Sequence, residues 1–268
     1  MNSLIHPTAV IHPEAELHES ATVGPYTVIE AGVRIGARCR VGPHCHILGE
    51  TQIGEDNEIH AGCVLGDTPQ DLAYKDALSS LIIGNGNRIR EHVTIHRGTA
   101  EGSATRIGDR NFLMAHCHIG HNSVLGNDVI VVNAVLLGGH VEVEDRAFLG
   151  GGAVVHQHCR IGTLTILRGL SRISKDVPPY CTVVENNELV GLNSIGLKRA
   201  GILPDERARL KTAYALLFNE GLNLTQALEA LKKETLTPQV SHLIEFITQS
   251  KRGICFARKK PTDLGEEN

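Results

Sequence analysis

The sequence predicts a mainly β protein in which a parallel β-helix of hexapeptide repeats is followed by a small α-helical C-terminal domain. An aliphatic residue recurs at every sixth position over about two thirds of the chain, and glycine often follows it. After Gly201 the spacing of apolar residues becomes helical. We therefore expect the β-helix over residues 1–190 and the helical domain over residues 191–268.

The six-residue repeat defines the predicted coil. From Ile5 to Ile173, every sixth residue is Ile, Leu or Val, with Asp71, Ala77 and Glu101 as the only exceptions. A small or β-branched residue often follows four positions later. Because side chains two apart on a strand face the same way, each unit predicts a short strand with two inward residues and a corner. Three units of six close one coil, so residues 18 apart are expected to stack.

The repeat is interrupted twice, near residues 66–82 and near residues 98–106. The aliphatic positions return in the same phase after each interruption, at Ile83 and at Ile107. Both segments are therefore expected to protrude from the coil as loops. Loops on a rigid scaffold often carry functional residues.

Most of the cysteines follow the same register. Five of the seven occupy the small inward position of the repeat: Cys39, Cys45, Cys63, Cys117 and Cys159. This placement predicts compact core residues. No CxxC pair is present, which argues against a disulfide framework or a zinc knuckle.

The end of the chain has a different character. Pro178 and Pro179 are expected to end the coil, and apolar residues with helical spacing follow. Helices are predicted to begin at Pro204, near Asn223 and at Pro238. Their apolar stripes are expected to be packing faces.

Composition bounds the class of protein. The chain has 268 residues with no tryptophan and 3% aromatic residues, which indicates an aliphatic core. No basic segment followed by an apolar run opens the sequence, and no stretch approaches about 18 consecutive apolar residues, so a cytoplasmic protein is expected. The net charge of -4 argues against general nucleic-acid binding.

The stretch HCHIGHNSVLG, residues 116–126, is the first candidate for chemistry. Stacking residues 18 apart places His121, Gly139 and Gln157 in one column. Because Gly139 has no side chain, a notch with an accessible backbone N–H is expected beside the imidazole of His121. The neighbouring column contains Asn122, His140 and His158.

Several other histidines are expected to be structural residues at the surface or at corners. They stand where the repeat usually has glycine: His6, His12, His18, His60 and His96. No histidine of the coil falls on an inward position, so buried histidines are not expected. His118 is placed above Leu136 and Val154, one face position from His121.

One outward column is apolar. It contains Phe112, Ile130, Phe148 and Ile166. An apolar stripe on the surface of a soluble protein usually marks an interface. We therefore predict that this face packs against another copy of the chain.

An ordered set of motifs links the chain to a known family. The motifs are QDLAYK (70–75), NRIREHVTIHRGT (87–99), HCHIGHNSVLG (116–126), GGHVEV (138–143), VVHQHCRIG (154–162), DVPPY (176–180) and GLNSIGLKRAG (191–201). The chain resembles the UDP-N-acetylglucosamine O-acyltransferase family, which opens lipid A biosynthesis. The resemblance implies a left-handed β-helix, an exception to the right-handed crossover rule, and a homotrimer with active sites between adjacent subunits.

The resemblance also implies a reaction and the residues that perform it. A 3-hydroxyacyl chain passes from acyl carrier protein to the 3-position of UDP-N-acetylglucosamine. His121 matches the general base, Gly139 the backbone donor to the oxyanion, and Gly169 the position that limits acyl-chain depth. The matching substrate-binding residues are Gln70, Asp71, His118, His140, His156, Gln157, Asn193 and Arg199. No metal, cofactor or covalent enzyme intermediate is implied.

Four residues depart from the family pattern. Ala73 stands where a lysine is common, and Asn122 where an aspartate is expected after the histidine. Ile195 and Ala200 replace a glutamate and a second arginine. These changes leave open whether the attacked sugar carries a 3-hydroxyl or a 3-amino group.

Three alternatives to this function stay open. A sister acyltransferase would use a 3-amino or other nucleotide-sugar acceptor. A metal-dependent hydratase would bind zinc through histidines such as His116, His118, His121 and His140. The third alternative is a scaffold without catalytic activity.

The end of the helical region is basic. Its cationic residues are Lys251, Arg252, Arg258, Lys259 and Lys260. They would attract the acidic surface of acyl carrier protein, with a strength that falls as salt rises. Ordinary solvated charge near a chain terminus is the alternative.

Overall fold

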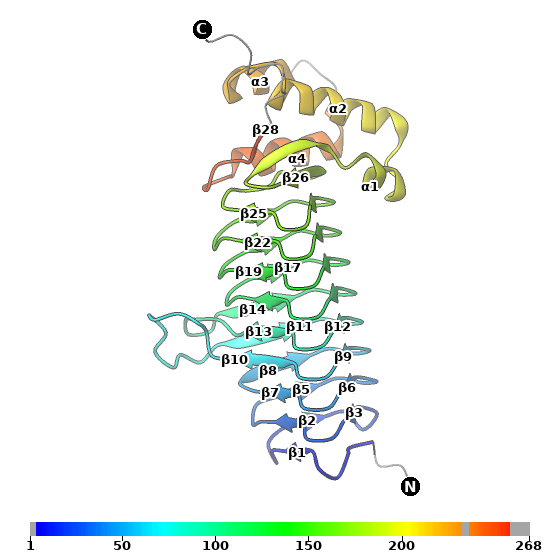
Figure 1. Cartoon of the computed structure of the whole chain (residues 1–268), viewed down its shortest axis with the longest axis vertical. Coiled ribbons are helices and arrows are strands. Elements are labelled where there is room, and N and C mark those ends of the chain that lie inside the picture. The colour runs from blue at the N-terminus through cyan, green and yellow to red at the C-terminus, as the bar shows by residue number, and fades with distance from the viewer. Residues whose placement is uncertain (1–3, 232–235, 258–268) are drawn as a thin grey trace.

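Figure 1 shows the computed structural model, which describes residues 4–231 and 236–257. A parallel β-helix takes up most of the long axis, and the helices gather at its C-terminal end. Among the described residues, no helix has the length and the apolar character needed to cross a bilayer.

Three parallel sheets form the walls of the coil, and we call them A, B and C. Sheet B stacks nine strands in the order β1 (Val10–Ile11), β4 (Val28–Ile29), β7 (His46–Ile47), β10 (Val64–Asp67), β13 (Thr94–His96), β16 (His118–Ile119), β19 (Leu136–Leu137), β22 (Val154–Val155) and β25 (Arg172–Ile173). Sheet C stacks eight strands in the order β2 (Glu16–Leu17), β5 (Arg34–Ile35), β8 (Glu50–Ile53), β11 (Ser80–Ile83), β14 (Ala104–Ile107), β17 (Val124–Leu125), β20 (Glu142–Val143) and β23 (Arg160–Ile161).

Sheet A is the longest and continues into the C-terminal region. It contains β3 (Thr22–Val23), β6 (Arg40–Val41), β9 (Glu58–Ile59), β12 (Arg88–Ile89), β15 (Phe112–Leu113), β18 (Ile130–Val131), β21 (Phe148–Leu149), β24 (Ile166–Leu167), β26 (Cys181–Val184), β27 (Glu188–Leu192) and β28 (Phe256–Ala257). The chain runs from sheet A to sheet B to sheet C in every coil, and we name the turns between them the A–B, B–C and C–A corners.

The register of the sheets confirms the predicted columns. Phe112 pairs with Ile130, Ile130 with Phe148, and Phe148 with Ile166. From Val23 onward, the inward aliphatic residues of the uninterrupted coils are buried and form one continuous core, against which the partly buried Ile11 and Leu17 pack. All seven cysteines are buried and none is in a disulfide, as the register predicted for the five in the repeat.

The two predicted loops are confirmed. Strand β10 ends at Asp67 and β11 begins at Ser80, while β13 ends at His96 and β14 begins at Ala104. Both loops leave the coil on the same side (Figure 1). They contact each other, because the Gly102 backbone N–H donates a hydrogen bond of 2.8 Å to the Leu78 carbonyl.

The C-terminal region begins as a continuation of the coil. The prediction that Pro178 and Pro179 end the coil is wrong in part, because β26 follows them and still pairs in parallel with β24. Strand β27 then turns back antiparallel to β26 and crosses residue 190. The division into two domains at that residue stays a prediction.

Four helices follow the last strands of the coil. They are α1 (Ser194–Arg199), α2 (Pro204–Phe218), α3 (Leu224–Leu231) and α4 (Pro238–Thr248). The predicted helix starts at Pro204 and Pro238 are confirmed, and α3 begins one residue after Asn223. Their apolar residues form a second core with Leu164 and Tyr180 of the coil, so the stripes are packing faces as predicted.

Candidate active site

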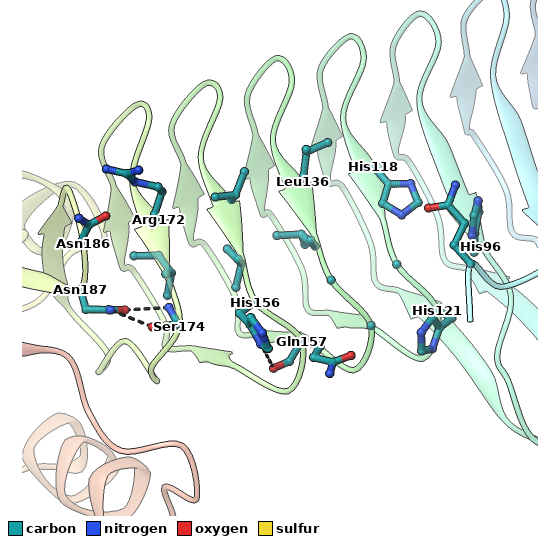
Figure 2. A pocket seen from close by; sticks show the side chains of 18 residues that line it. His96, His118, His121, Leu136, His156, Gln157, Arg172, Ser174, Asn186 and Asn187 are labelled. Atoms are coloured by element: carbon teal, nitrogen blue, oxygen red, sulfur yellow. Dashed lines mark hydrogen bonds between the residues drawn. The ribbon is translucent and has the colours of Figure 1, made fainter. Parts of the chain in front are cut away.

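A cavity of about 720 Å³ lies on the outer face of sheet B and along the B–C corner. Figure 2 shows His96, His118 and His121 at one end, Arg172 and Asn186 at the other, and Leu136 between them. The lining residues are Gln70, His96, His118, Gly120, His121, Leu136, Leu137, Gly138, Gly139, Val154, Val155, His156, Gln157, Arg172, Ile173, Ser174, Asn186 and Asn187. The cavity is therefore polar at both ends and apolar in the middle.

The backbone of the B–C corner fixes the direction of the side chains that line the cavity. The third residue of successive corners adopts the left-handed conformation, with φ of 59° at Asn122, 58° at His140 and 63° at His158. Asparagine, histidine and glycine tolerate this region better than branched residues do. The residue before it, His121 in one coil and Gly139 in the next, therefore projects to the cavity side.

The ring of His121 lies directly over Gly139. A Cβ atom at position 139 would stand 2.4 Å from both Nε2 and Cε1 of His121, so only glycine leaves room for the ring. The Gly139 backbone N–H makes no hydrogen bond to the described part of the chain. The predicted pairing of an imidazole with an open glycine is thus present, and a free N–H accompanies it.

The hydrogen bonds around Asn122 define the tautomer of His121. Nδ1 of His121 lies 3.0 Å from Oδ1 of Asn122. The same oxygen accepts hydrogen bonds from Thr99, 3.1 Å from its backbone N and 2.9 Å from Oγ1. A backbone N–H only donates, so the Asn122 atom facing it is the oxygen, and His121 Nδ1 must be the donor. In the neutral ring, Nε2 is therefore the free acceptor.

His118 is held neutral beside His121. Its Nδ1 is 2.7 Å from the hydroxyl of Thr94. Burial, with smaller effects from His96 and His121, lowers the pKa of His118 to about 4. At neutral pH this ring can donate a hydrogen bond to a ligand without carrying charge.

His96 was missed by the sequence argument. The expectation of a structural histidine at the surface is wrong here, because His96 is 6% exposed and lines the cavity. Its ring meets that of His118 edge-on, with centroids 4.8 Å apart. Burial is the main cause that lowers the pKa of His96. Its Nδ1 is buried and has no hydrogen-bond partner among the described residues.

His140 borders the same site from the next coil. Its ring meets that of His121 edge-on at 5.2 Å and stacks on that of His158 at 4.5 Å. Burial, followed by His158 and His121, lowers the pKa of His140, while the charge of Asp71 opposes this shift. The first protruding loop therefore brings Asp71 close to the histidines, and Gln70 of the same loop lines the cavity.

His156 and Gln157 extend the cavity toward the helices. Nη2 of Arg252 lies 3.1 Å from Nδ1 of His156. Because a guanidinium only donates, this Nδ1 is an acceptor and His156 carries its proton on Nε2 when neutral. The Gln157 carbonyl lies 3.2 Å from the same Nδ1 (Figure 2), and because it can only accept, it would need a proton on Nδ1 and so competes with Arg252 for this nitrogen.

Three predicted site residues lie elsewhere in the chain. Asn193 and Arg199 line a groove of about 840 Å³ on the face of sheet A, together with Phe148. Asn193 is buried as the N-cap of α1, where Oδ1 accepts from the Gly196 backbone N–H at 2.9 Å and Nδ2 donates to the Leu164 carbonyl at 2.8 Å. Gly169 stands at an A–B corner, outside both cavities.

The residues that depart from the family pattern are divided in the same way. Ile195 and Ala200 line the groove on sheet A, while Ala73 lies in the first protruding loop and Asn122 contacts His121. Ile195 is exposed on the surface. The four departures therefore lie partly in the groove on sheet A and partly near the cavity that contains His121.

The four histidines of the zinc alternative do not converge. His116 stacks on His92 at an A–B corner, with ring centroids 5.0 Å apart, whereas His121 and His140 meet at the B–C corner. Within residues 4–231 and 236–257, no group of three or more His, Cys, Asp or Glu is placed to hold a metal ion.

The fold and the imidazole over glycine define a hexapeptide-repeat transferase. A family model described as bacterial transferase hexapeptide matches residues 32–67, and one described as UDP-N-acetylglucosamine O-acyltransferase, domain 2, matches residues 176–255. The acyl-[acyl-carrier-protein]–UDP-N-acetylglucosamine O-acyltransferase of Gloeothece citriformis is 47% identical over 205 residues, covering 76% of this chain and 74% of its own.

Solved structures agree with these sequence matches. LpxA from Acinetobacter baumannii has a TM-score of 0.91 at 40% identity, covering 94% of this chain and 99% of its own. UDP-N-acetylglucosamine acyltransferase from Campylobacter jejuni has a TM-score of 0.89 at 36% identity, covering 95% and 100%. The chain belongs to the UDP-N-acetylglucosamine O-acyltransferase family. It is an acyltransferase with the left-handed β-helix fold.

Proposed function

We propose that this protein transfers a 3-hydroxyacyl chain from acyl carrier protein to the 3-hydroxyl of UDP-N-acetylglucosamine, the first step of lipid A biosynthesis. The observation that carries the proposal is the ring of His121 against Gly139, with Nδ1 hydrogen-bonded to Asn122. This arrangement presents a free imidazole nitrogen and a free backbone N–H on one wall of the cavity.

His121 acts as the general base. Its Nε2 accepts the proton of the sugar 3-hydroxyl as that oxygen attacks the thioester carbonyl. The carbonyl oxygen becomes an oxyanion, and the Gly139 N–H donates a hydrogen bond to it. When the tetrahedral intermediate collapses, the C–S bond breaks and the carrier thiol takes the proton back from the imidazolium.

Asn122 orients the base without sharing its charge. Its Oδ1 accepts a hydrogen bond from the Nδ1–H of His121 and so keeps Nε2 directed to the substrate side. A carboxylate at this position would also stabilise the imidazolium formed during attack, whereas a neutral amide contributes only its dipole. Thr99 keeps the amide oxygen turned toward the ring.

The neighbouring polar residues bind the nucleotide sugar. Gln70, Asp71, His118, His140, His156 and Gln157 surround His121 on this side of the coil. The neutral ring of His118 serves as an uncharged hydrogen-bonding group for the sugar. No step needs a metal or a cofactor.

The site is completed by a second copy of the chain in a homotrimer. Asn193, Arg199 and Gly169 are assigned to uridine, phosphate and acyl-chain recognition, and they lie on sheet A and an A–B corner, away from His121. An adjacent copy that packs its sheet A against the sheet B cavity would supply them. The apolar column on sheet A supports this packing.

The reaction is assigned to the cytoplasm, where acyl carrier protein and nucleotide sugars are available as dissolved substrates.

The experiment that tests the proposal is a turnover assay of the purified protein. Acyl carrier protein loaded with 3-hydroxyacyl chains of several lengths is combined with UDP-N-acetylglucosamine or with its 3-amino analogue. The proposal predicts ester formation on the 3-hydroxyl sugar at the higher kcat/KM. Preference for the 3-amino sugar would assign the chain to the sister reaction, and absence of transfer to either sugar would overturn the proposal.

A further inference from the structure

A second groove lies beside the active-site cavity, between the B–C corner and the segment that follows α4. It has a volume of about 900 Å³. Its lining residues are His140, Glu142, His158, Arg160, Asp176, Gln249, Lys251 and Arg252. Three of these are permanent cations, and two histidine rings stand with them.

The acidic residues of the groove are already engaged. Asp176 is buried, and it accepts hydrogen bonds of 2.9 Å from the Arg160 backbone N–H and 2.7 Å from the Ser250 hydroxyl. Glu142 faces the guanidinium of Arg160 at 3.7 Å. Arg160 also lies over the ring of Phe246, 4.2 Å from its centroid. These contacts leave Lys251 and Arg252 as the cations that face an incoming anion.

Lys251 and Arg252 have no carboxylate partner in the part of the chain that the structure describes. Lys251 is exposed. Nη2 of Arg252 donates to His156 Nδ1 and to the Ser174 carbonyl, each at 3.1 Å, and its buried Nε has no acceptor among the described residues. The guanidinium of Arg252 is therefore held in place by neutral groups, and no carboxylate among the described residues forms an ion pair with it.

The groove is continuous with the active site through two residues. His140 lines the groove and its ring meets that of His121. Arg252 lines the groove and holds His156, which lines the cavity. A ligand that occupies both spaces would place its anionic part in the groove and its reacting part near His121.

We propose that this groove binds a phosphoryl group of a substrate, with Lys251, Arg252 and the stacked rings of His140 and His158 as its donors. A guanidinium and an ammonium on one wall match the charge and the hydrogen-bonding capacity of phosphate oxygens. The inference rests on the proposed function, because both of its substrates carry phosphate. These are the phosphodiester of the carrier's pantetheine arm and the diphosphate of the nucleotide sugar, for which the groove would act in addition to the proposed contact with Arg199 of an adjacent copy.

The test uses two variants of the full-length protein, Lys251→Ala and Arg252→Lys. The second keeps the positive charge but removes the planar guanidinium and its paired N–H donors. Arg34→Ala, an exposed arginine on the second coil, is the matched control for loss of a cation. KM is measured for UDP-N-acetylglucosamine, for acyl-4′-phosphopantetheine and for acyl-pantetheine. Titration calorimetry with UDP-N-acetylglucosamine and with acyl-4′-phosphopantetheine gives Kd values that do not depend on turnover.

We expect both groove variants to weaken one phosphorylated ligand about tenfold. An effect on UDP-N-acetylglucosamine assigns the groove to the diphosphate. Weaker binding of acyl-4′-phosphopantetheine, so that its KM no longer lies below that of acyl-pantetheine, assigns the groove to the carrier arm. If the KM and Kd values of the groove variants equal those of Arg34→Ala for both ligands, the proposed phosphoryl binding in the groove is overturned while the proposed function stays intact. Absence of transfer by the unaltered protein would overturn the function, and the calorimetric comparison would still decide the groove.

Discussion

Nδ1 of His121 and Oδ1 of Asn122 are 3.0 Å apart, and that oxygen also accepts from the backbone and the hydroxyl of Thr99. The relationship orients the base through an amide where the family pattern has a carboxylate. In the proposed mechanism, the tautomer of the base is therefore fixed, but the charge that develops on its ring has no anionic neighbour at Nδ1. Substitution at position 122 separates these two effects.

Replacement of Asn122 tests how the base is oriented. Asn122→Leu removes the acceptor, so kcat is expected to fall about 10-fold to 100-fold while KM changes little. Asn122→Asp keeps the acceptor and adds charge, so kcat at neutral pH is expected to be retained or increased. Its pH–rate profile should show the acid limb at higher pH, because a carboxylate favours the protonated ring. Equal kcat and pH profiles for all three proteins would remove Asn122 from the mechanism.

Gly139→Ala tests the close approach of the ring and the backbone. The added Cβ would lie 2.4 Å from two atoms of the His121 ring, so the ring must leave its position. We expect kcat to fall by about 10²-fold or more, with the far-ultraviolet circular dichroism spectrum preserved. Gly151→Ala is the control, since a Cβ there meets its nearest atom at an ordinary 3.4 Å. A fully active Gly139→Ala enzyme would contradict the proposed oxyanion site.

A half-buried ion pair joins α4 to the coil and makes stability depend on pH. Nε2 of His242 lies 3.1 Å from Oε2 of Glu144, and Nδ1 lies 2.9 Å from the Tyr180 hydroxyl. The hydrogen bond to Glu144 is the main cause that raises the pKa of His242. Burial opposes ionisation of Glu144, but hydrogen bonds from His242 and Thr163 outweigh it and lower the pKa of Glu144.

The two shifts set the pH window in which the pair stabilises the fold. A raised pKa at His242 gives stability that is present below the ordinary histidine pKa and is lost as pH rises through the folded value. A lowered pKa at Glu144 gives stability that is lost as pH falls through its own folded value. We expect His242→Gln to cost about 1 kcal/mol near pH 6, measured by denaturant unfolding, and much less near pH 9. A cost that does not vary with pH would exclude the ion pair as its cause.

The apolar column on sheet A predicts the oligomeric state. Phe148→Glu places a charge in the centre of the proposed contact and is expected to convert the proposed trimer to monomers. The measurement is light scattering with size-exclusion chromatography at micromolar concentration, together with turnover. Val124→Glu on the exposed face of sheet C is the control and should stay trimeric. If the unaltered protein is a monodisperse monomer, the composite site is wrong.

Sequence periodicity predicted the coil because a single rule governs it: aliphatic residues point inward every six positions and coils stack with an offset of 18. The same rule placed His121 over Gly139, because these residues are 18 apart and residues with that spacing stack in successive coils. Segments in which the six-residue repeat is interrupted could not be predicted from periodicity. His96 begins the second protruding loop, where the corner geometry changes, and it became buried although its position in the repeat indicated the surface.

Long-range contacts of the C-terminal region were the least predictable. Helix α1 is short, yet its N-cap at Asn193 and the basic pair Lys198 and Arg199 in its last turn are signals that would have indicated it. The contact between Arg252 and His156 joins residues 96 apart and depends on how α4 packs on the coil. The sequence analysis named His156 as a substrate-binding residue and Arg252 as a basic residue of the tail, but it did not predict their contact. Arg258, Lys259 and Lys260 lie outside the described residues, so docking of the basic tail stays a prediction.

The most direct test of the central claim is steady-state turnover of His121→Ala beside His116→Ala. His116 belongs to the same motif but stacks on His92 at the A–B corner, so it is the matched control. With acyl carrier protein and UDP-N-acetylglucosamine, we predict that His121→Ala lowers kcat by about 10²-fold or more with little change in KM, while His116→Ala keeps normal kcat. A His121→Ala enzyme with the kcat of the unaltered protein would contradict the account.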